Sequence, residues 1–291
     1  MNQKIHKRSL VVSWVWPLFL LLLLSPVLGI PNDKITVEEI IAKHLDSIGK
    51  PEARAANKSR IMQGSVLATI RMGGKGQSRG GSVMASQGMM SLIGLVFGPQ
   101  EYSNEKAAFD GKRLTLGEFS PGMRTKLGGF LLTHDVIFRE GLLGGTLSTA
   151  WPLLNIAERA PKLKYVGTKN IDGRLTHVLR YEPRSGGNLE IRLYFDAETF
   201  RHVRTEYQQD IAPPPVNDPA QSALQKETHL KLTEEFSDFK SEAGLVLPHD
   251  YRLQLTFDSA NDPLLQDWTV VLTQFVFNQP IPQRQFDLTA K

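Results

Sequence analysis

The sequence predicts an α+β fold: one helix at the start of the mature chain, then a sheet of many strands that one helical insert interrupts. Apolar residues recur at helical spacing over residues 37–48, and with a period of two from about Ser59 onward. The segment from Pro121 to Leu154 is apolar and rich in glycine but does not follow the strand pattern. Of 291 residues, 41% are hydrophobic. We therefore expect residues 30–291 to form a single domain with a sizeable core.

The first 29 residues have the layout of a secretory signal peptide. Basic residues precede an uncharged run with "FLLLLL" at its centre, Pro26 breaks that run, and "VLG" supplies the small residues of a cleavage site. We expect export to the periplasm and a mature chain that begins near Ile30. The alternative is a membrane anchor formed by residues 9–30, because the uncharged run is just long enough to span a bilayer.

Charge and cysteine content exclude several classes of function. Removal of Lys4, Lys7 and Arg8 with the signal peptide lowers the formal net charge from +4 to near +1. No cluster of basic residues lies on one helix or beside aromatic residues, so we expect no nucleic-acid partner. The chain has no cysteine, which excludes disulfides, thiolate metal sites and cysteine nucleophiles.

The first predicted helix has signals at both ends. Thr36 with Glu39 fits a capping box, and Gly49 followed by Pro51 predicts the stop. We interpret His44 on this helix as a packed or solvent-facing residue rather than a ligand. The apolar stripe consists of Val37, Ile40, Ile41, Leu45 and Ile48.

The first strands follow from Ser59. "RIMQGSVLATIR" alternates like a strand, and "GGKGQSRGG" predicts a flexible hairpin connection, since it lacks the spacing of a phosphate loop. The next stretch, "SVMASQGMMSLIGLVFG", is apolar on both faces and should be covered on both faces. Its apolar residues include Met89, Met90, Leu92, Leu95 and Phe97.

Two later segments predict tight hairpins. "FDGK" at 109–112 and "IDGR" at 171–174 each place Asp-Gly between extended runs, which is typical of a two-residue type I′ turn. We interpret both aspartates as turn formers.

The stretch "LYFDAETFRHV" places Asp196, Glu198 and His202 close together, as a carboxylate pair or a metal site would need. Matching the apolar faces of the flanking strands instead requires an odd loop of three or five residues centred on Ala197. Asp196 and Glu198 then lie in a turn, and His202 lies on the polar outer face.

That register makes two further predictions. It places Ile191 opposite Val203, and Glu190 opposite Arg204 as a cross-strand ion pair.

The helical insert, residues 121–154, has apolar residues at helical spacing that glycines interrupt. It could be a fixed plug of the core or a movable lid over an apolar cavity, since Gly-rich breaks can serve as hinges. The apolar residues that would face the cavity are Leu127, Phe130, Leu131, Phe138, Leu142 and Trp151.

The C-terminal part contains a second irregular segment. Residues 210–223 carry four prolines and predict a surface loop. Strands resume after it, and we expect the tail "NQPIPQRQFDL" to be extended.

The order of these motifs resembles the LolA/LolB-type outer-membrane lipoprotein-sorting or carrier family. The resemblance runs from "VEEIIAKHLDSIG" through "FDGK", the insert, "IDGR" and "LYFDAETFRHVRTEY" to "FKSEAGLVLPHDYRL" and "FVFNQPIPQRQFDL". It implies a strongly curved antiparallel sheet, a half barrel closed by helices, whose concave apolar face holds acyl chains. The family's strand before the FDG-type hairpin has an arginine, followed by proline, that helps tie down the lid. Here "MASQGMMSLIGLVFG" has neither.

The sequence offers little for catalysis. H-E-x-x-H is absent, and the one G-x-S-x-G, "GQSRG" at 76–80, lies in the predicted hairpin connection with no helix after it, unlike a nucleophile elbow. His249 and Asp250 are adjacent in a predicted strand and so point to opposite faces. A two-histidine metal site from His134 and His249 is a remaining alternative.

We therefore expect a monomeric, non-enzymatic carrier without cofactor or metal. Its partners would be a lipid or the acyl chains of a lipoprotein, and membrane-bound donor or acceptor proteins. The ligand site would combine Met89, Met90, Leu92, Leu95 and Phe97 with the apolar residues of the insert. The alternative is an envelope-assembly protein that binds another protein through its sheet edge.

Overall fold

A computed structural model describes residues 35–71, 75–98, 102–118, 122–212, 228–258 and 264–290. The predicted signal peptide and most of the Pro-rich segment lie outside the described residues. Residues 35–291 form one compact unit. In the part of the chain that the structure describes, no helix is long and apolar enough to cross a membrane.

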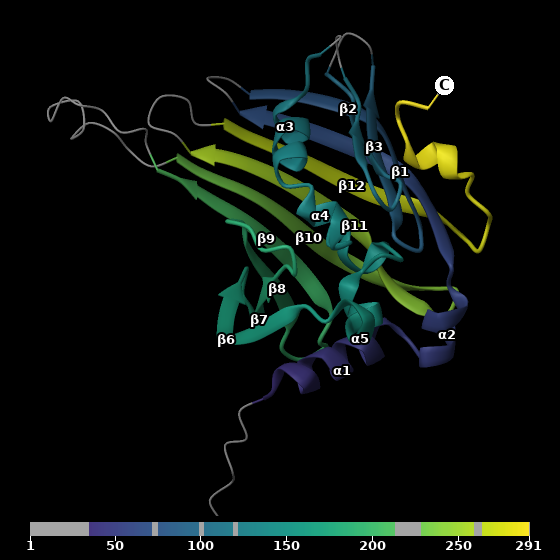
Figure 1. Ribbon diagram of the computed structural model, residues 1–291, viewed down its shortest axis with the longest axis vertical. Helices are drawn as coiled ribbons and strands as arrows, with labels where there is room; N and C mark the ends of the chain where they lie inside the picture. Colours follow the sequence, from purple (N-terminus) through teal and green to yellow (C-terminus); the bar gives the residue numbers. More distant parts are fainter. Residues whose placement is uncertain are drawn as a thin grey trace, which may run out of the picture. The chain divides into compact units, whose positions relative to one another are not determined.

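The main element is a curved, open antiparallel sheet of twelve strands within the described residues, as the predicted α+β half barrel requires (Figure 1). The strand order is β5-β4-β3-β2-β1-β12-β11-β10-β9-β8-β7-β6. The strands are β1 (Ser59–Arg71), β2 (Lys75–Gln87), β3 (Met90–Phe97), β4 (Glu105–Phe109), β5 (Leu114–Leu116), β6 (Lys162–Ile171), β7 (Arg174–Glu182), β8 (Glu190–Asp196), β9 (His202–Ile211), β10 (Thr228–Glu242), β11 (Leu245–Asp258) and β12 (Leu264–Phe277).

The topology explains where the helical insert lies. Strands β1–β5 form one meander and β6–β12 form a second, and the two meet where β1 pairs with β12. Strands β5 and β6 are therefore at opposite edges of the sheet, although they are consecutive in the chain. The insert that joins them runs across the concave face (Figure 1).

The helices agree with the prediction except at two places. They are α1 (Val37–Ile48), α2 (Pro51–Ala56), α3 (Lys126–Thr133), α4 (Val136–Arg139) and α5 (Ile156–Arg159), with 3-10 helices η1 (Gly145–Leu147), η2 (Pro152–Asn155) and η3 (Gln283–Phe286). Thr36 caps α1 by accepting a hydrogen bond from the Glu39 backbone N–H. Pro51 begins a second helix, α2, which the sequence did not predict, because proline suits the first position of a helix. The tail is not fully extended, since η3 forms within it.

Strands β1 and β2 form a hairpin, as predicted, but β2 begins at Lys75 and includes most of the Gly-rich stretch. Gly80 allows the close approach of β3: a Cβ there would lie 2.1 Å from the carbonyl oxygen of Val96.

Strand β3 is covered on both faces, as predicted. The insert packs on one face, and Ile281 and Phe286 of the C-terminal tail pack on the other.

The β8–β9 register differs from the prediction. Ile191 lies opposite Tyr207 instead of Val203, and Glu190 lies opposite Gln208 instead of Arg204. The loop has five residues, 197–201, and is centred on Thr199 instead of Ala197.

His202 is fully buried, so its predicted place on the polar outer face was wrong. An irregularity in the β8–β9 ladder pairs Tyr194 with Arg204 but Phe195 with His202 and leaves Val203 as the extra residue. Such a bulge reverses the alternation of side chains, and it turns His202 into the core.

The two Asp-Gly turns form different hairpins. Asp172 and Gly173 both have positive φ between the paired residues Ile171 and Arg174, which fits the predicted type I′ turn. In the other hairpin the backbone N–H of Asp110 bonds the carbonyl of Arg113, so the turn is one residue later. The carboxylate of Asp110 accepts hydrogen bonds from the backbone N–H groups of Lys112 and Arg113.

Candidate functional site

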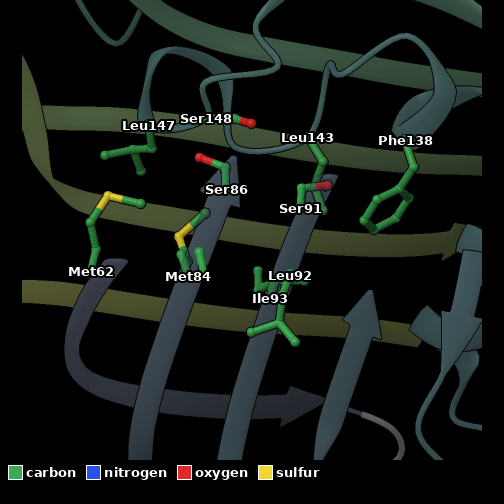
Figure 2. Close-up of a pocket in the computed structure, with 11 residues that line it drawn as sticks. Met62, Met84, Ser86, Ser91, Leu92, Ile93, Phe138, Leu143, Leu147 and Ser148 are labelled. Atoms are coloured by element: carbon green, nitrogen blue, oxygen red, sulfur yellow. The ribbon is translucent and has the colours of Figure 1, made fainter. Parts of the chain in front are cut away.

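The concave face of the sheet and the insert form one apolar core. The predicted residues that meet there are Leu95, Phe97, Leu127, Phe130, Leu131, Phe138, Leu142 and Trp151, all at most 6% exposed. The structure does not bring the other three to this core. Met90 and Leu92 pack with Ile281 and Phe286 on the opposite face, and Met89 lies in the β2–β3 turn beside Arg159. Leu92 also borders the cavity beneath Phe138 and Leu143 (Figure 2).

Several core residues were not among the predicted site residues. Met62, Met84 and Ile93 line a cavity of about 20 Å³ beneath Phe138 and Leu143 of the insert (Figure 2). A second cavity of about 10 Å³ lies between α3 and strands β3, β4 and β11. Each cavity has room for about one water molecule. The insert therefore fills the concave face, and a larger ligand would have to displace it.

A buried carboxyl group holds the middle of the insert. Glu234 of β10 accepts hydrogen bonds from the backbone N–H of Gly144 at 2.7 Å, Tyr251 Oη at 2.8 Å and Tyr207 Oη at 2.7 Å. Among the described residues no basic side chain forms an ion pair with it. Burial raises the pKa of Glu234 to about 7.

A buried arginine forms a second link. Arg60 of β1 donates from Nη1 to the carbonyl oxygen of Thr146 at 2.5 Å and from Nε to Oδ1 of Asn57 at 2.7 Å. Burial lowers the pKa of Arg60 to about 10. The resemblance implied an arginine in the strand before the FDG-type hairpin, where this chain has none. Here an arginine from β1 contacts the insert instead.

Two histidines complete the attachment of the insert. His44 Nδ1 donates to the carbonyl oxygen of Phe200 at 3.0 Å, and His44 Nε2 accepts from the indole of Trp151 at 3.0 Å. His202 stacks on Trp151 with ring centroids 4.5 Å apart. Burial lowers the pKa of His44 to about 4 and that of His202 well below its usual value, so both rings are neutral near pH 7.

The segment Gly144–Trp151, which we call the anchored segment, is thus joined to strands β1 and β10 and to helix α1. A further bond runs from the backbone N–H of Thr149 to Oγ of Ser86 in β2 at 2.9 Å. Buried hydrogen bonds of this kind are costly to break without replacement. They fix this part of the insert to the sheet.

Glu105 of β4 is a second buried acid without an ion-pair partner among the described residues. It accepts hydrogen bonds from Thr125 Oγ1 at 2.5 Å and Tyr102 Oη at 3.0 Å, and Gln266 donates to that tyrosine oxygen at 3.2 Å. Burial raises the pKa of Glu105 to about 7. Thr125 also caps α3 by accepting from the Gly128 backbone N–H.

The predicted turn at Asp196 is confirmed. One carboxylate oxygen accepts hydrogen bonds from the backbone N–H groups of Glu198 and Thr199 and from the Thr199 hydroxyl. Burial acts to raise the pKa of Asp196, but these hydrogen bonds outweigh it and hold the pKa below its usual value. These bonds are typical of an aspartate that begins a turn.

The described residues contain no group of three or more His, Asp or Glu side chains placed to hold a metal ion. His134 and His249 have separate neighbours: His134 packs on Phe130, and His249 packs on Phe275 beside Glu242. These contacts give no support to a two-histidine metal site.

No protein-family model matches the chain, and no curated protein matches its sequence. The chain is similar to several solved structures. A LolA superfamily protein from Nitrosomonas europaea is 12% identical with a TM-score of 0.45, and the match covers 87% of this chain and 98% of that one. A DUF1329 family protein from Desulfovibrio piger is 8% identical with a TM-score of 0.42, covering 88% and 99%. A domain named for outer membrane lipoprotein sorting, from Vibrio parahaemolyticus, is 11% identical with a TM-score of 0.38, covering 84% and 97%. The likeness is one of fold.

Proposed function

We propose that this protein is a non-enzymatic carrier or binding protein for an apolar chain, either a lipid or the acyl part of a lipoprotein, in the bacterial cell envelope. One observation carries the proposal: an insert that joins opposite edges of the sheet packs apolar side chains against its concave face. The ligand would replace those side chains and bind where they now pack.

A long chain supplies free energy that offsets the displacement of the insert. Each CH₂ group that leaves water gains roughly 0.8 kcal/mol, so a chain of about ten such groups gains roughly 8 kcal/mol. Phe130 and Leu131 of α3 are at most 5% exposed and would lose comparable contacts when they move away. A ligand that fills their place restores the contacts of the sheet residues that Phe130 and Leu131 had covered.

The edges of the sheet weigh against the alternative, an assembly protein that pairs with another chain through an exposed strand. Edge strand β5 has only three residues. Edge strand β6 has a bulge at Val166, and its lysines 162, 164 and 169 are exposed. Short strands, bulges and lysines are the features by which proteins prevent edge pairing.

The proposed location is the periplasm, with membrane-bound donor and acceptor proteins as partners. The signal peptide motif of residues 1–29 supports this location. Intact mass of protein purified from its native envelope tests it: the expected mature chain begins near Ile30, and a retained Met1 would contradict cleavage.

The ligand itself can be tested in two steps. Mass spectrometry of organic extracts from natively purified protein should find a lipid in stoichiometric amounts. Purified protein should also bind a fluorescent fatty-acid probe. Phe130→Ser with Leu131→Ser should then stay folded by circular dichroism and show altered probe uptake, because the insert would open more easily.

Leu132→Ser is the matched control, since Leu132 lies in the same helix but is 45% exposed. It should bind the probe as the wild type does. The proposal would have to be abandoned if the wild type binds neither probe nor extracted lipid and the double variant unfolds, since the insert would then be fixed core.

A further inference from the structure

Helix α3 rests on the sheet mainly through apolar side chains. Leu127 and Leu131 point to the cavity that Ile93 and Leu95 of β3 border from the opposite side. The polar contacts of α3 are at its two ends, where Thr125 meets Glu105 and His134 meets Gln209. Of the parts of the insert, α3 is therefore the one that a ligand can displace at least cost, whereas the anchored segment Gly144–Trp151 stays in place.

Glu105 borders the same cavity as these leucines. A carboxyl group in an apolar core, 5% exposed and without a basic partner, costs stability that an apolar residue would not. Lys106 also borders the cavity, but it follows Glu105 directly in β4, so its side chain points to the other face, where it is exposed. The acid is thus the ionisable group that a ligand under α3 would meet.

Displacement of α3 would change the hydrogen bonding of Glu105. Tyr102 would remain, but the hydroxyl of Thr125 would leave with the N-terminus of the helix. A buried carboxylate that loses a donor must find another. A ligand head that carries an O–H, N–H or ammonium group supplies one, whereas a free carboxylate brings only acceptors and a like charge.

We propose that the space beneath α3 is the acyl-chain site, and that Glu105 selects chains whose head group donates a hydrogen bond, such as acylglycerols or amines, over free fatty acids. Glu105 is thus a specificity-determining residue. This inference rests on the proposed carrier function and adds the class of head group to it.

The test compares ligands that share one chain length and differ in the head: monolaurin, dodecylamine and laurate. Their affinities come from displacement of N-phenyl-1-naphthylamine fluorescence at about pH 8, above the pKa of about 7 that burial gives Glu105. The wild type should bind monolaurin and dodecylamine about tenfold more tightly than laurate, which corresponds to about 1.4 kcal/mol. Glu105→Gln should bring the three affinities to within about threefold of one another.

Two further variants separate selection from stability. Glu234→Gln changes a buried acid that does not border this cavity and should keep the wild-type preference. Thr125→Val removes the donor on α3 and should strengthen binding of all three ligands without changing their order.

The outcomes distinguish the two levels of the proposal. Binding of all three ligands by the wild type without preference, or an unchanged preference in Glu105→Gln, would overturn the head-group assignment and leave the carrier function standing. If the wild type binds neither the naphthylamine nor any of the three ligands, the carrier function fails and the head-group assignment fails with it. The wild-type comparison needs no variant, so equal binding of the three ligands would overturn the assignment even if Glu105→Gln does not fold.

Discussion

The indole Nε1–H of Trp151 donates a hydrogen bond to Nε2 of His44 over 3.0 Å, and this buried bond joins the helical insert to helix α1. It also fixes the tautomer of His44, whose Nδ1 must carry the proton donated to the Phe200 carbonyl. The bond thereby links helix α1 to the insert across 107 positions of sequence.

The first prediction follows from that bond. Trp151→Phe removes the donor and leaves His44 Nε2 buried without a partner, which should lower the free energy of unfolding by about 1–3 kcal/mol beyond the loss of packing. Urea unfolding of Trp151→Phe, His44→Ala and the double variant measures the coupling. Strictly additive effects would show that the bond contributes nothing.

The second prediction concerns the buried acid of the anchored segment. The pKa of Glu234 is raised from 4.5 to about 7, so between these pH values the folded state binds more protons than the unfolded state. Its contribution to the free energy of unfolding therefore falls as pH rises through this window, by roughly 3 kcal/mol at most.

The difference in unfolding free energy between wild type and Glu234→Gln, measured from about pH 4.5 to 7.5, isolates this contribution from other groups. His44 and His202 act in the opposite direction, since their pKa values are lowered, and they cancel in the difference. A difference that does not vary with pH would contradict the assigned direction.

Two glycines of the insert should respond oppositely to alanine. Gly145 has a φ of +49°, and a Cβ there would lie 2.6 Å from Nδ1 of His202, so Gly145→Ala should destabilise the fold by roughly 1–3 kcal/mol. Gly129 lies within α3 with open space at its Cβ position, so Gly129→Ala should stabilise by about 0.5–1 kcal/mol. Thermal or denaturant unfolding of both variants checks this, and equal effects would refute it.

The loop at Asp196 should prove dispensable for binding. Asp196→Asn with Glu198→Gln keeps the acceptor oxygen of the turn, so the free energy of unfolding should fall by at most about 1 kcal/mol. Because the pKa of Asp196 is lowered, the wild-type advantage should disappear as pH falls below 3.8. Loss of lipid binding in a folded double variant would mean that the carboxylates have a functional role.

The last prediction tests the link from β1. Arg60→Met removes both hydrogen bonds of the guanidinium and leaves the buried carbonyl of Thr146 unpaired, which should cost about 1–3 kcal/mol. Hydrogen exchange should accelerate around η1 in particular. Uniform acceleration over the whole sheet would instead indicate a general loss of stability without a specific link.

Much of the fold could be predicted from the sequence, because its signals are local. The stripe of α1, the Asp-Gly turn at 172–173 and the loss of strand alternation in the insert each depend on residues within a few positions of one another. Strand β3 has apolar residues on both faces, which predicted that both faces are covered. The sequence did not predict that the C-terminal tail covers one of these faces.

Only the tertiary structure decided how the site is assembled. A single extra residue, Val203, turned His202 from the outer face into the core, and periodicity cannot reveal a bulge whose cause lies in the neighbouring strand. Met90 resembles a cavity residue by composition, but the register of β3 sends it to the face where Ile281 and Phe286 pack.

The same holds for the buried acids. Glu105 and Glu234 look like ordinary exposed acids in the sequence. The groups that donate hydrogen bonds to them belong to Thr125 and Gly144, which are 20 and 90 positions away along the chain. The sequence by itself determined which segments are helix, strand and insert, since local periodicity and turn chemistry set those. The pairing of strands across the sheet decided which polar groups are buried together, because the cost of burying each group depends on partners that only folding brings near.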